Sequence, residues 1–191
     1  MKKKICAWAI GVMLSSLIPL MGTAQSYHRL VARDFTGTAP IDNAFAAYTF
    51  CYVHYSYSTT KHNGVYSIDF DVQLEFNGQK SYIRFDQIGS NATVTDILDH
   101  EQGHYNIAWL MRNELYTVLS HHHYTANYQY EIASLFKVVD LKYHKLNDDY
   151  ETQTMHMTNH KNQLKWDTWF NQQLNNSDLA ENRSTSSVGQ Y

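Results

Sequence analysis

The sequence is poor in the residues that build disulfide-rich or nucleic-acid-binding proteins. It has two cysteines in 191 residues, and Cys6 lies in an N-terminal segment that we expect to be removed. An intrachain disulfide is then excluded, and Cys51, in a strand-like run, is expected to be a small core residue. Basic residues number 15 against 18 acidic ones, so the formal net charge is −3. This balance argues against a nucleic-acid partner.

Long hydrophobic runs are lacking after residue 24. Before it, three lysines at positions 2–4 precede a mostly apolar stretch from Ile5 to Met21 and small residues at 22–24. This order is typical of a secretory signal peptide, and the stretch is short for a membrane span, although an uncleaved anchor is the alternative. Cleavage after residue 24 leaves 12 basic against 18 acidic residues, a net charge of −6. We expect a secreted or periplasmic bacterial protein with no stable membrane association.

Strand patterns fill the first half of the remaining chain. Residues 47–58 are rich in β-branched and aromatic residues, and residues 65–76 alternate between apolar and polar side chains. The apolar positions of the second run are Tyr66, Ile68, Phe70, Val72, Leu74 and Phe76. This alternation predicts an antiparallel sheet with one solvated face. Asn77-Gly78 predicts a hairpin turn into residues 81–85, with Ile83 and Phe85 pointing inward.

Helical patterns follow from about Thr93. Apolar residues recur every three or four positions in three segments, residues 97–119, 128–146 and 159–174. Strands first and helices afterwards indicate an α+β fold, with one domain over residues 25–175. Residues 176–191 are rich in Asn and Ser without an apolar period, and we expect them to be disordered.

The most informative motif is His100-Glu101-Gln102-Gly103-His104, an HExxH pattern. On a helix, histidines four positions apart share one face, so both can bind one Zn²⁺. Glu101 is rotated away from that face and can act as a general base on a water molecule. With eleven His and six Glu in the chain, about 0.02 chance matches are expected.

The flanks of the motif favour a helix. Thr93 or Thr95 can be the N-cap, with Asp96 in the first turn, and no proline occurs between residues 97 and 119. The helix has an apolar face whose edge carries the two histidines. The alternative is that the His and Glu side chains only decorate this edge.

A catalytic zinc site needs a third protein ligand. Leu110 stands where the extended metzincin motif needs histidine, so that class is excluded. Glu114 lies about 15 Å along the helix from His104, too far to share the metal. Glu131 and Asp140 on the next predicted helix stay open as acidic ligands. We expect His121, His122 and His123 to be a solvated helix end, and His144 and His160 are weaker alternates.

A downstream segment, Tyr150-Glu151-Thr152-Gln153-Thr154-Met155-His156, completes a recognisable combination. Together with HEQGH, the Trp-containing last helix and an Asp34-Phe35-x-Gly37-x-x-Pro40 lead-in, it resembles a bacterial secreted family described as predicted zinc-dependent proteases. The resemblance runs from about Leu30 to Leu174. It implies a zincin-like fold and a Zn²⁺ cofactor.

The resemblance also implies roles for single residues. His156 would be the third metal ligand beside His100 and His104, with Tyr150 and Thr154 nearby. Tyr150 could donate to a developing oxyanion, or it could be a core aromatic; Thr154 could hold His156 or cap a helix. Two positions depart from the family pattern, since Met157 replaces a usual glycine and Glu151 a usual aspartate.

The motif and the resemblance predict a zinc metallopeptidase that acts on a peptide or protein substrate, with Glu101 as general base. An edge strand near residues 81–85 could pair with an extended substrate. Two alternatives remain. One is a zinc amidase that acts on peptidoglycan or another non-protein substrate, and the other is a non-catalytic secreted binding module with a degenerate metal site.

Overall fold

The structure, a computed structural model, describes residues 25–41, 45–88 and 93–187. Strands and short 3-10 turns come first and three helices follow, so the predicted α+β fold is confirmed. The expected signal peptide lies outside the described residues. Within the described residues, no helix combines the length and the apolar character that a bilayer span requires.

The sheet part is one long hairpin and a short strand pair. β2 (Cys51–His62) and β3 (Val65–Phe76) pair antiparallel along their whole length, from Cys51 opposite Phe76 to His62 opposite Val65. Asn63 and Gly64 join them with φ of 51° and 84°, and a two-residue turn with positive φ suits the twist of such a hairpin. On β3, Val72 and Leu74 are buried on the predicted apolar face.

The predicted hairpin between residues 65–76 and 81–85, joined by Asn77-Gly78, is wrong. β3 pairs with β2, and the segment after it detours before β4 (Tyr82–Ile83) pairs with β1 (Ala47–Tyr48). Backbone hydrogen bonds hold the detour to the lead-in, from Thr36 N–H to the Gly78 carbonyl and from Gly37 N–H to the Ser81 carbonyl. Ile83 is buried as expected, whereas Phe85 is exposed. Two 3-10 turns, Ala32–Asp34 and Phe85–Gln87, flank this region.

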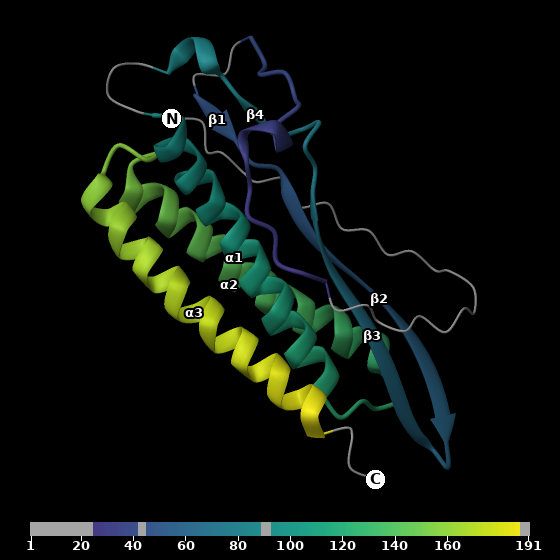
Figure 1. Ribbon diagram of the computed structural model, residues 1–191. Helices are drawn as coiled ribbons and strands as arrows, with labels where there is room; N and C mark the ends of the chain where they lie inside the picture. The colour runs from purple at the N-terminus through teal and green to yellow at the C-terminus, as the bar shows by residue number, and fades with distance from the viewer. Residues whose placement is uncertain (1–24, 42–44, 89–92, 188–191) are drawn as a thin grey trace.

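Three helices lie side by side along the hairpin (Figure 1). They are α1 (Val94–His121), α2 (Tyr128–Thr154) and α3 (His160–Ser187). Thr93 is the N-cap of α1, and its side chain accepts a hydrogen bond from the backbone N–H of Asp96, as predicted. α2 continues eight residues beyond its predicted end. α3 continues to Ser187, into the segment predicted to be disordered, a prediction that stays untested.

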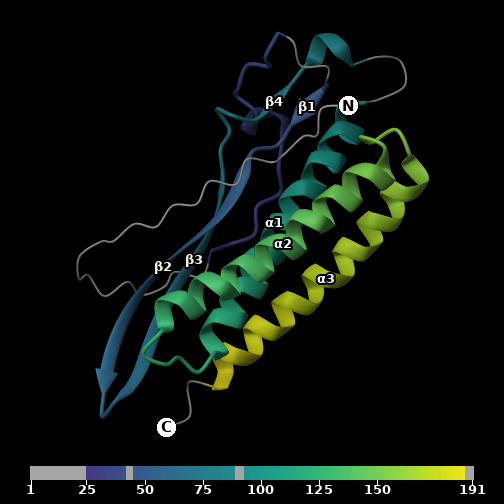
Figure 2. The same ribbon diagram turned by 180° about the vertical axis from the view of Figure 1, so that it is seen from behind.

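The core forms around α1, which contacts the hairpin on one side and α2 and α3 on the other (Figures 1 and 2). Side chains that lie almost wholly inside include Ile97, Ile107, Met111, Leu115, Leu119, Ile132 and Phe170. Burial of each such side chain contributes about 1.5–3 kcal/mol. Cys51 is buried, as predicted for a small core residue. The motif thus lies on the most enclosed helix of the molecule.

Candidate metal centre

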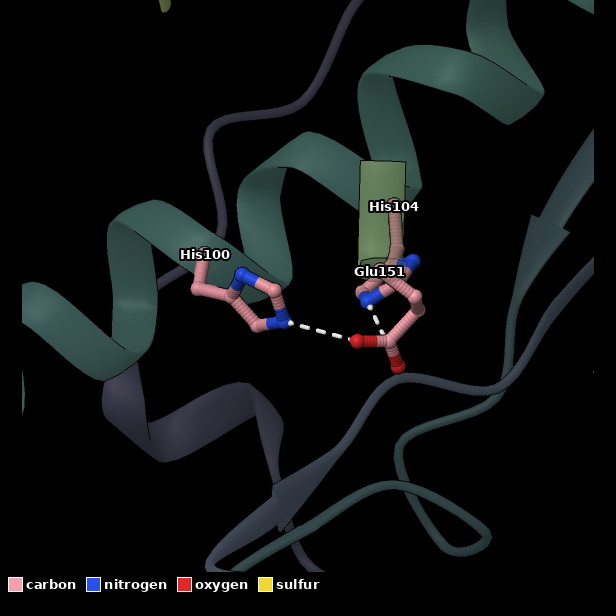
Figure 3. Close-up of side chains that lie close together, drawn as sticks. All are labelled: His100, His104 and Glu151. Atoms are coloured by element: carbon pink, nitrogen blue, oxygen red, sulfur yellow. Dashed lines mark ion pairs between the residues drawn. The ribbon is translucent and has the colours of Figure 1, made fainter. Parts of the chain in front are cut away.

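Two histidines of α1 and one glutamate of α2 converge (Figure 3). The ligand atoms of His100, His104 and Glu151 lie within 4.8 Å of one another. The carboxylate faces both rings, with 3.5 Å from Oε2 to His100 Nε2 and 3.6 Å from Oε1 to His104 Nε2. Metal–ligand bonds of about 2.0–2.2 Å place neighbouring ligand atoms about 3.3–3.5 Å apart in a tetrahedral site. These three side chains could hold a metal ion.

Glu151, and not the predicted His156, completes this group. Because α2 runs to Thr154, Glu151 still lies on the helix and faces α1. His156 lies just beyond the helix end, and its side chain is 58% exposed. Its Nδ1 is 2.8 Å from Glu151 Oε2, and its ring lies against Phe45. The structure therefore brings His156 to Glu151 as a hydrogen-bond partner.

The outer nitrogen of each histidine has a buried partner. His100 Nδ1 lies 3.2 Å from Oε1 of Gln163 on α3, and His104 Nδ1 lies 2.7 Å from Oδ1 of Asn147 on α2. Each amide oxygen can only accept, so the tautomer that satisfies these contacts carries its proton on Nδ1. In a neutral ring Nε2 then carries the lone pair, and in both histidines Nε2 faces Glu151; a protonated His100 instead donates from Nε2 to that carboxylate. This is the outer-shell arrangement that orients imidazole ligands of metals.

Tyr150 packs under the motif. Its ring stacks on His100 with 5.0 Å between centroids, and its hydroxyl lies 2.9 Å from the His100 carbonyl, to which it can donate. Gln163 Nε2 donates to the same hydroxyl. Burial raises the pKa of Tyr150 well above its ordinary value, so it stays protonated. The Tyr150 hydroxyl is thus hydrogen-bonded to the backbone of His100 and to Gln163. Its predicted role as a donor to an oxyanion stays a prediction without geometric support.

Gly103 makes room for this tyrosine. A Cβ at Gly103 would lie 2.2 Å from the Tyr150 hydroxyl oxygen, a distance that atoms do not tolerate. Gln102, next to it, faces the other way: its Oε1 accepts from the Leu30 backbone N–H and its Nε2 donates to the Tyr27 hydroxyl. The two middle residues of the motif therefore fix the packing of α2 and of the N-terminal lead-in against α1.

Glu101 is buried, with 4% of its surface exposed. Its backbone carbonyl accepts a long hydrogen bond from Thr49 Oγ1, at 3.5 Å. Its side-chain Oε2 is inaccessible and has no hydrogen-bond partner. A buried carboxylate oxygen without a hydrogen-bond partner destabilises a fold. Its presence beside a candidate metal group suggests that it pairs with an oxygen of a bound water or substrate molecule.

Charges at the centre favour an ionised Glu151. Burial opposes its charge, but the hydrogen bond to His100 and the charges of His104 and His100 hold the Glu151 pKa well below its usual range. Burial lowers the pKa of His104. For His100 burial also disfavours the charge, yet the Glu151 hydrogen bond and the Glu101 charge prevail and raise its pKa. One ionised carboxylate between two imidazoles suits a divalent cation.

The other candidate ligands lie elsewhere. Glu131 hydrogen-bonds Thr125, Asp140 lies 3.3 Å from His144, and Glu114 pairs with Lys142. Histidines 121–123 are exposed at the end of α1, as expected. The buried Thr154 hydroxyl donates to the Tyr150 carbonyl within α2. Among the described residues, only His100, His104 and Glu151 form a group of this kind.

Sequence reasoning missed Glu151, Asn147 and Gln163. Glu151 was visible only as the acid beside Tyr150, and the predicted helix ended too early to include it among acids that a second helix can supply. Asn147 lies four residues before it, on the same side of α2, a spacing that a longer helix would have shown. Gln163 could not be recognised from the sequence, because the amide partner of a histidine has no fixed distance from it along the chain.

A cavity of about 220 Å³ lies beside the centre. It is lined by Asp96, Asp99, Met157, His160, Gln163, Leu164 and Asp167. A second cavity, of about 270 Å³, lies between the three helices at Trp169 and Tyr143 and has none of the cluster residues in its lining.

Comparison with known protein families gives a match over most of the chain. A family model described as "Bacterial protein of unknown function (DUF922)" matches residues 23–157. The matched segment includes both histidines, Glu101 and Glu151, and ends before α3. No curated protein matches, and no solved structure matches.

Proposed function

The chain belongs to the DUF922 family of bacterial proteins of unknown function, and on that footing we propose that it is a zinc-dependent metallopeptidase. His100, His104 and Glu151 would hold the metal. The observation that carries the proposal is the convergence of two Nε2 lone pairs and one carboxylate, with each outer Nδ1 held by a buried amide. Three protein ligands that leave a position open are typical of catalytic zinc, whereas structural zinc usually has four.

The donor set favours zinc among common cations. Mg²⁺ and Ca²⁺ prefer oxygen ligands throughout, whereas imidazole nitrogen suits zinc and other transition metals. Two histidines and one glutamate are a known set for catalytic zinc in hydrolases. In such a site zinc supplies Lewis acidity, which acidifies a water molecule and polarises a carbonyl.

Glu101 is the residue that would move protons. Its unpartnered Oε2 would take a proton from the attacking water as the water oxygen bonds to the amide carbon. As the C–N bond breaks, Glu101 would return that proton to the leaving amine. Its burial in the second turn of α1 keeps the carboxylate fixed for both transfers.

A peptide is the substrate that the surroundings favour. Within the described residues β4 pairs only with β1, a two-stranded sheet to which an extended chain could add as a further strand. The β1–β4 pair lies near the start of α1 in both views, with β1 on the side of the helix (Figures 1 and 2). We also propose that the protein acts outside the cytoplasm, because its N-terminus has the pattern of a signal peptide.

Digestion assays test this proposal. Zinc-loaded wild type and Glu101→Gln are incubated with casein and, separately, with cell-wall sacculi. Glu114→Gln is the matched control, since Glu114 is on the same helix but pairs with Lys142. We expect casein cleavage by wild type and control, and at least a hundredfold loss in Glu101→Gln with zinc retained. Full turnover by Glu101→Gln would contradict the general base, and cleavage of sacculi alone would make the protein an amidase.

A further inference from the structure

Tyr82 has an unexplained buried hydroxyl. Its side chain is 3% exposed, and its hydroxyl oxygen is inaccessible and without a hydrogen-bond partner. Among the described residues, only two other buried side-chain polar atoms share this state, Glu101 Oε2 and Trp109 Nε1. Trp109 packs between Tyr27 and Arg112 in the core. Unpaired buried hydroxyls destabilise a fold, and phenylalanine would avoid that cost.

The fold brings Tyr82 towards Glu101. Tyr82 on β4 lies opposite Tyr48 on β1. Thr49, the residue after Tyr48, donates a hydrogen bond from its hydroxyl to the backbone carbonyl of Glu101. The β1–β4 pair thus rests on the turn of α1 that carries the proposed base. Burial raises the pKa of Tyr82; the Arg84 charge lowers it, and the charge of the Glu101 carboxylate raises it. Tyr82 therefore stays protonated and can donate.

Two buried and unpaired atoms of opposite character thus belong to the β1–β4 pair and to the turn of α1 that it contacts, a phenol that can donate and a carboxylate oxygen that can accept. We propose that Tyr82 is a catalytic residue whose hydroxyl donates a hydrogen bond to the reacting oxygen held by Glu101. The inference rests on the proposed function. It involves no proton transfer from Tyr82, only stabilisation of the charge that develops on that oxygen. Catalytic hydrogen bonds are often completed only when a ligand binds. The Tyr82 hydroxyl and Glu101 Oε2 would each find their partner in the bound ligand.

Binding of acetohydroxamate tests the inference without knowledge of the natural substrate. Its two oxygens bind a metal and take the place of the reacting water and carbonyl. The Co²⁺-loaded wild type, Tyr82→Phe and Tyr48→Phe are titrated with it and followed by visible absorption, and metal affinity and melting temperature are measured on each. Tyr48 is the ring neighbour of Tyr82 on the same strand pair, which makes it the control.

We expect Tyr82→Phe to bind acetohydroxamate about tenfold more weakly, with unchanged metal affinity and an unchanged or higher melting temperature. Tyr48→Phe should behave as wild type. Unchanged acetohydroxamate affinity in Tyr82→Phe overturns the inference and leaves the metal site intact. If the wild type itself binds no metal, the proposed function fails, and this inference fails with it.

Discussion

At the scale of single residues, the identity of the third ligand sets the charge of the site. Glu151 contributes one negative charge, whereas a histidine in that place would contribute none. The neighbouring His156 hydrogen-bonds the same carboxylate oxygen that faces His100. A histidine in this position limits the orientations of the glutamate, which keeps the carboxylate towards the two imidazoles of the proposed metal site.

Gln163 is the residue through which α3 acts on the centre. Replacement by leucine removes the partner of His100 Nδ1 and of the Tyr150 hydroxyl. We expect the zinc affinity of Gln163→Leu to fall by about 10–100-fold, the usual effect of losing an outer-shell partner. Competition with a chromogenic chelator measures it. Gln173→Leu, a change on the same helix at the other cavity, is the control, and equal affinities in the two variants would refute the role of Gln163.

At the scale of elements, the crossing of α1 and α2 depends on a missing side chain. Gly103 lies inside a helix, where glycine costs about 0.5–1 kcal/mol relative to alanine. Here the Tyr150 ring occupies the space of a Cβ. Glycine lowers the helix propensity at position 103, but only glycine leaves room for α1 and α2 to pack this closely.

Gly103→Ala tests this crossing. In an exposed helix the change stabilises, but here we expect it to lower the free energy of unfolding by about 1–3 kcal/mol, because the Tyr150 ring must shift. Urea unfolding measures the loss. A double-mutant cycle with Tyr150→Ala should show strong coupling, since alanine at position 103 fits once the ring is gone. Additive effects would mean that the contact is unimportant.

The end of α2 holds three consecutive non-glycine residues in the left-handed region. Met155, His156 and Met157 have φ of 50°, 52° and 70°. Left-handed backbone costs an L-residue about 1–2 kcal/mol. Met157 is half-buried against the core, and the burial of its side chain offsets part of this cost. The turn reverses the chain and places His156 against Glu151.

Met155 is exposed, so its replacement by glycine isolates the backbone contribution. We expect Met155→Gly to raise the free energy of unfolding by about 0.5–1 kcal/mol, since glycine is preferred after a helix end. Gln153→Gly, two residues earlier and helical, should instead lower it by about 1 kcal/mol. Denaturant midpoints compare the two. A loss of stability in Met155→Gly would show that the turn is not left-handed in solution.

Much of this architecture could be predicted from local pattern. The strand alternation of residues 65–76 and the capping box at Thr93 fix β3 and the start of α1 through neighbouring residues alone. The end of α2 could not be predicted, because Tyr150 and Thr154 are held in the helix by burial against α1 and α3. Glu151 was missed for the same reason, since its place beside the two histidines depends on a tertiary contact.

At the scale of the whole molecule, the centre draws on all three helices. α1 supplies both histidines and the proposed base, α2 supplies Glu151, and α3 supplies Gln163. The family match ends at residue 157, before α3 begins. The buried Phe170, whose ring packs on Tyr150, ties α3 to the same point. The metal group is therefore a product of the complete helical layer and not of the motif alone.

The most direct measurement is zinc content per chain, by elemental mass spectrometry, in wild type, Glu151→Ala and His156→Ala purified without a tag or chelator. We predict about one zinc per chain in the wild type. His156→Ala should keep it, because His156 only contacts the ligand, and Glu151→Ala should lose it. Zinc retained in Glu151→Ala but lost in His156→Ala would contradict the assignment of the third ligand, and no zinc in the wild type would contradict the metal centre itself.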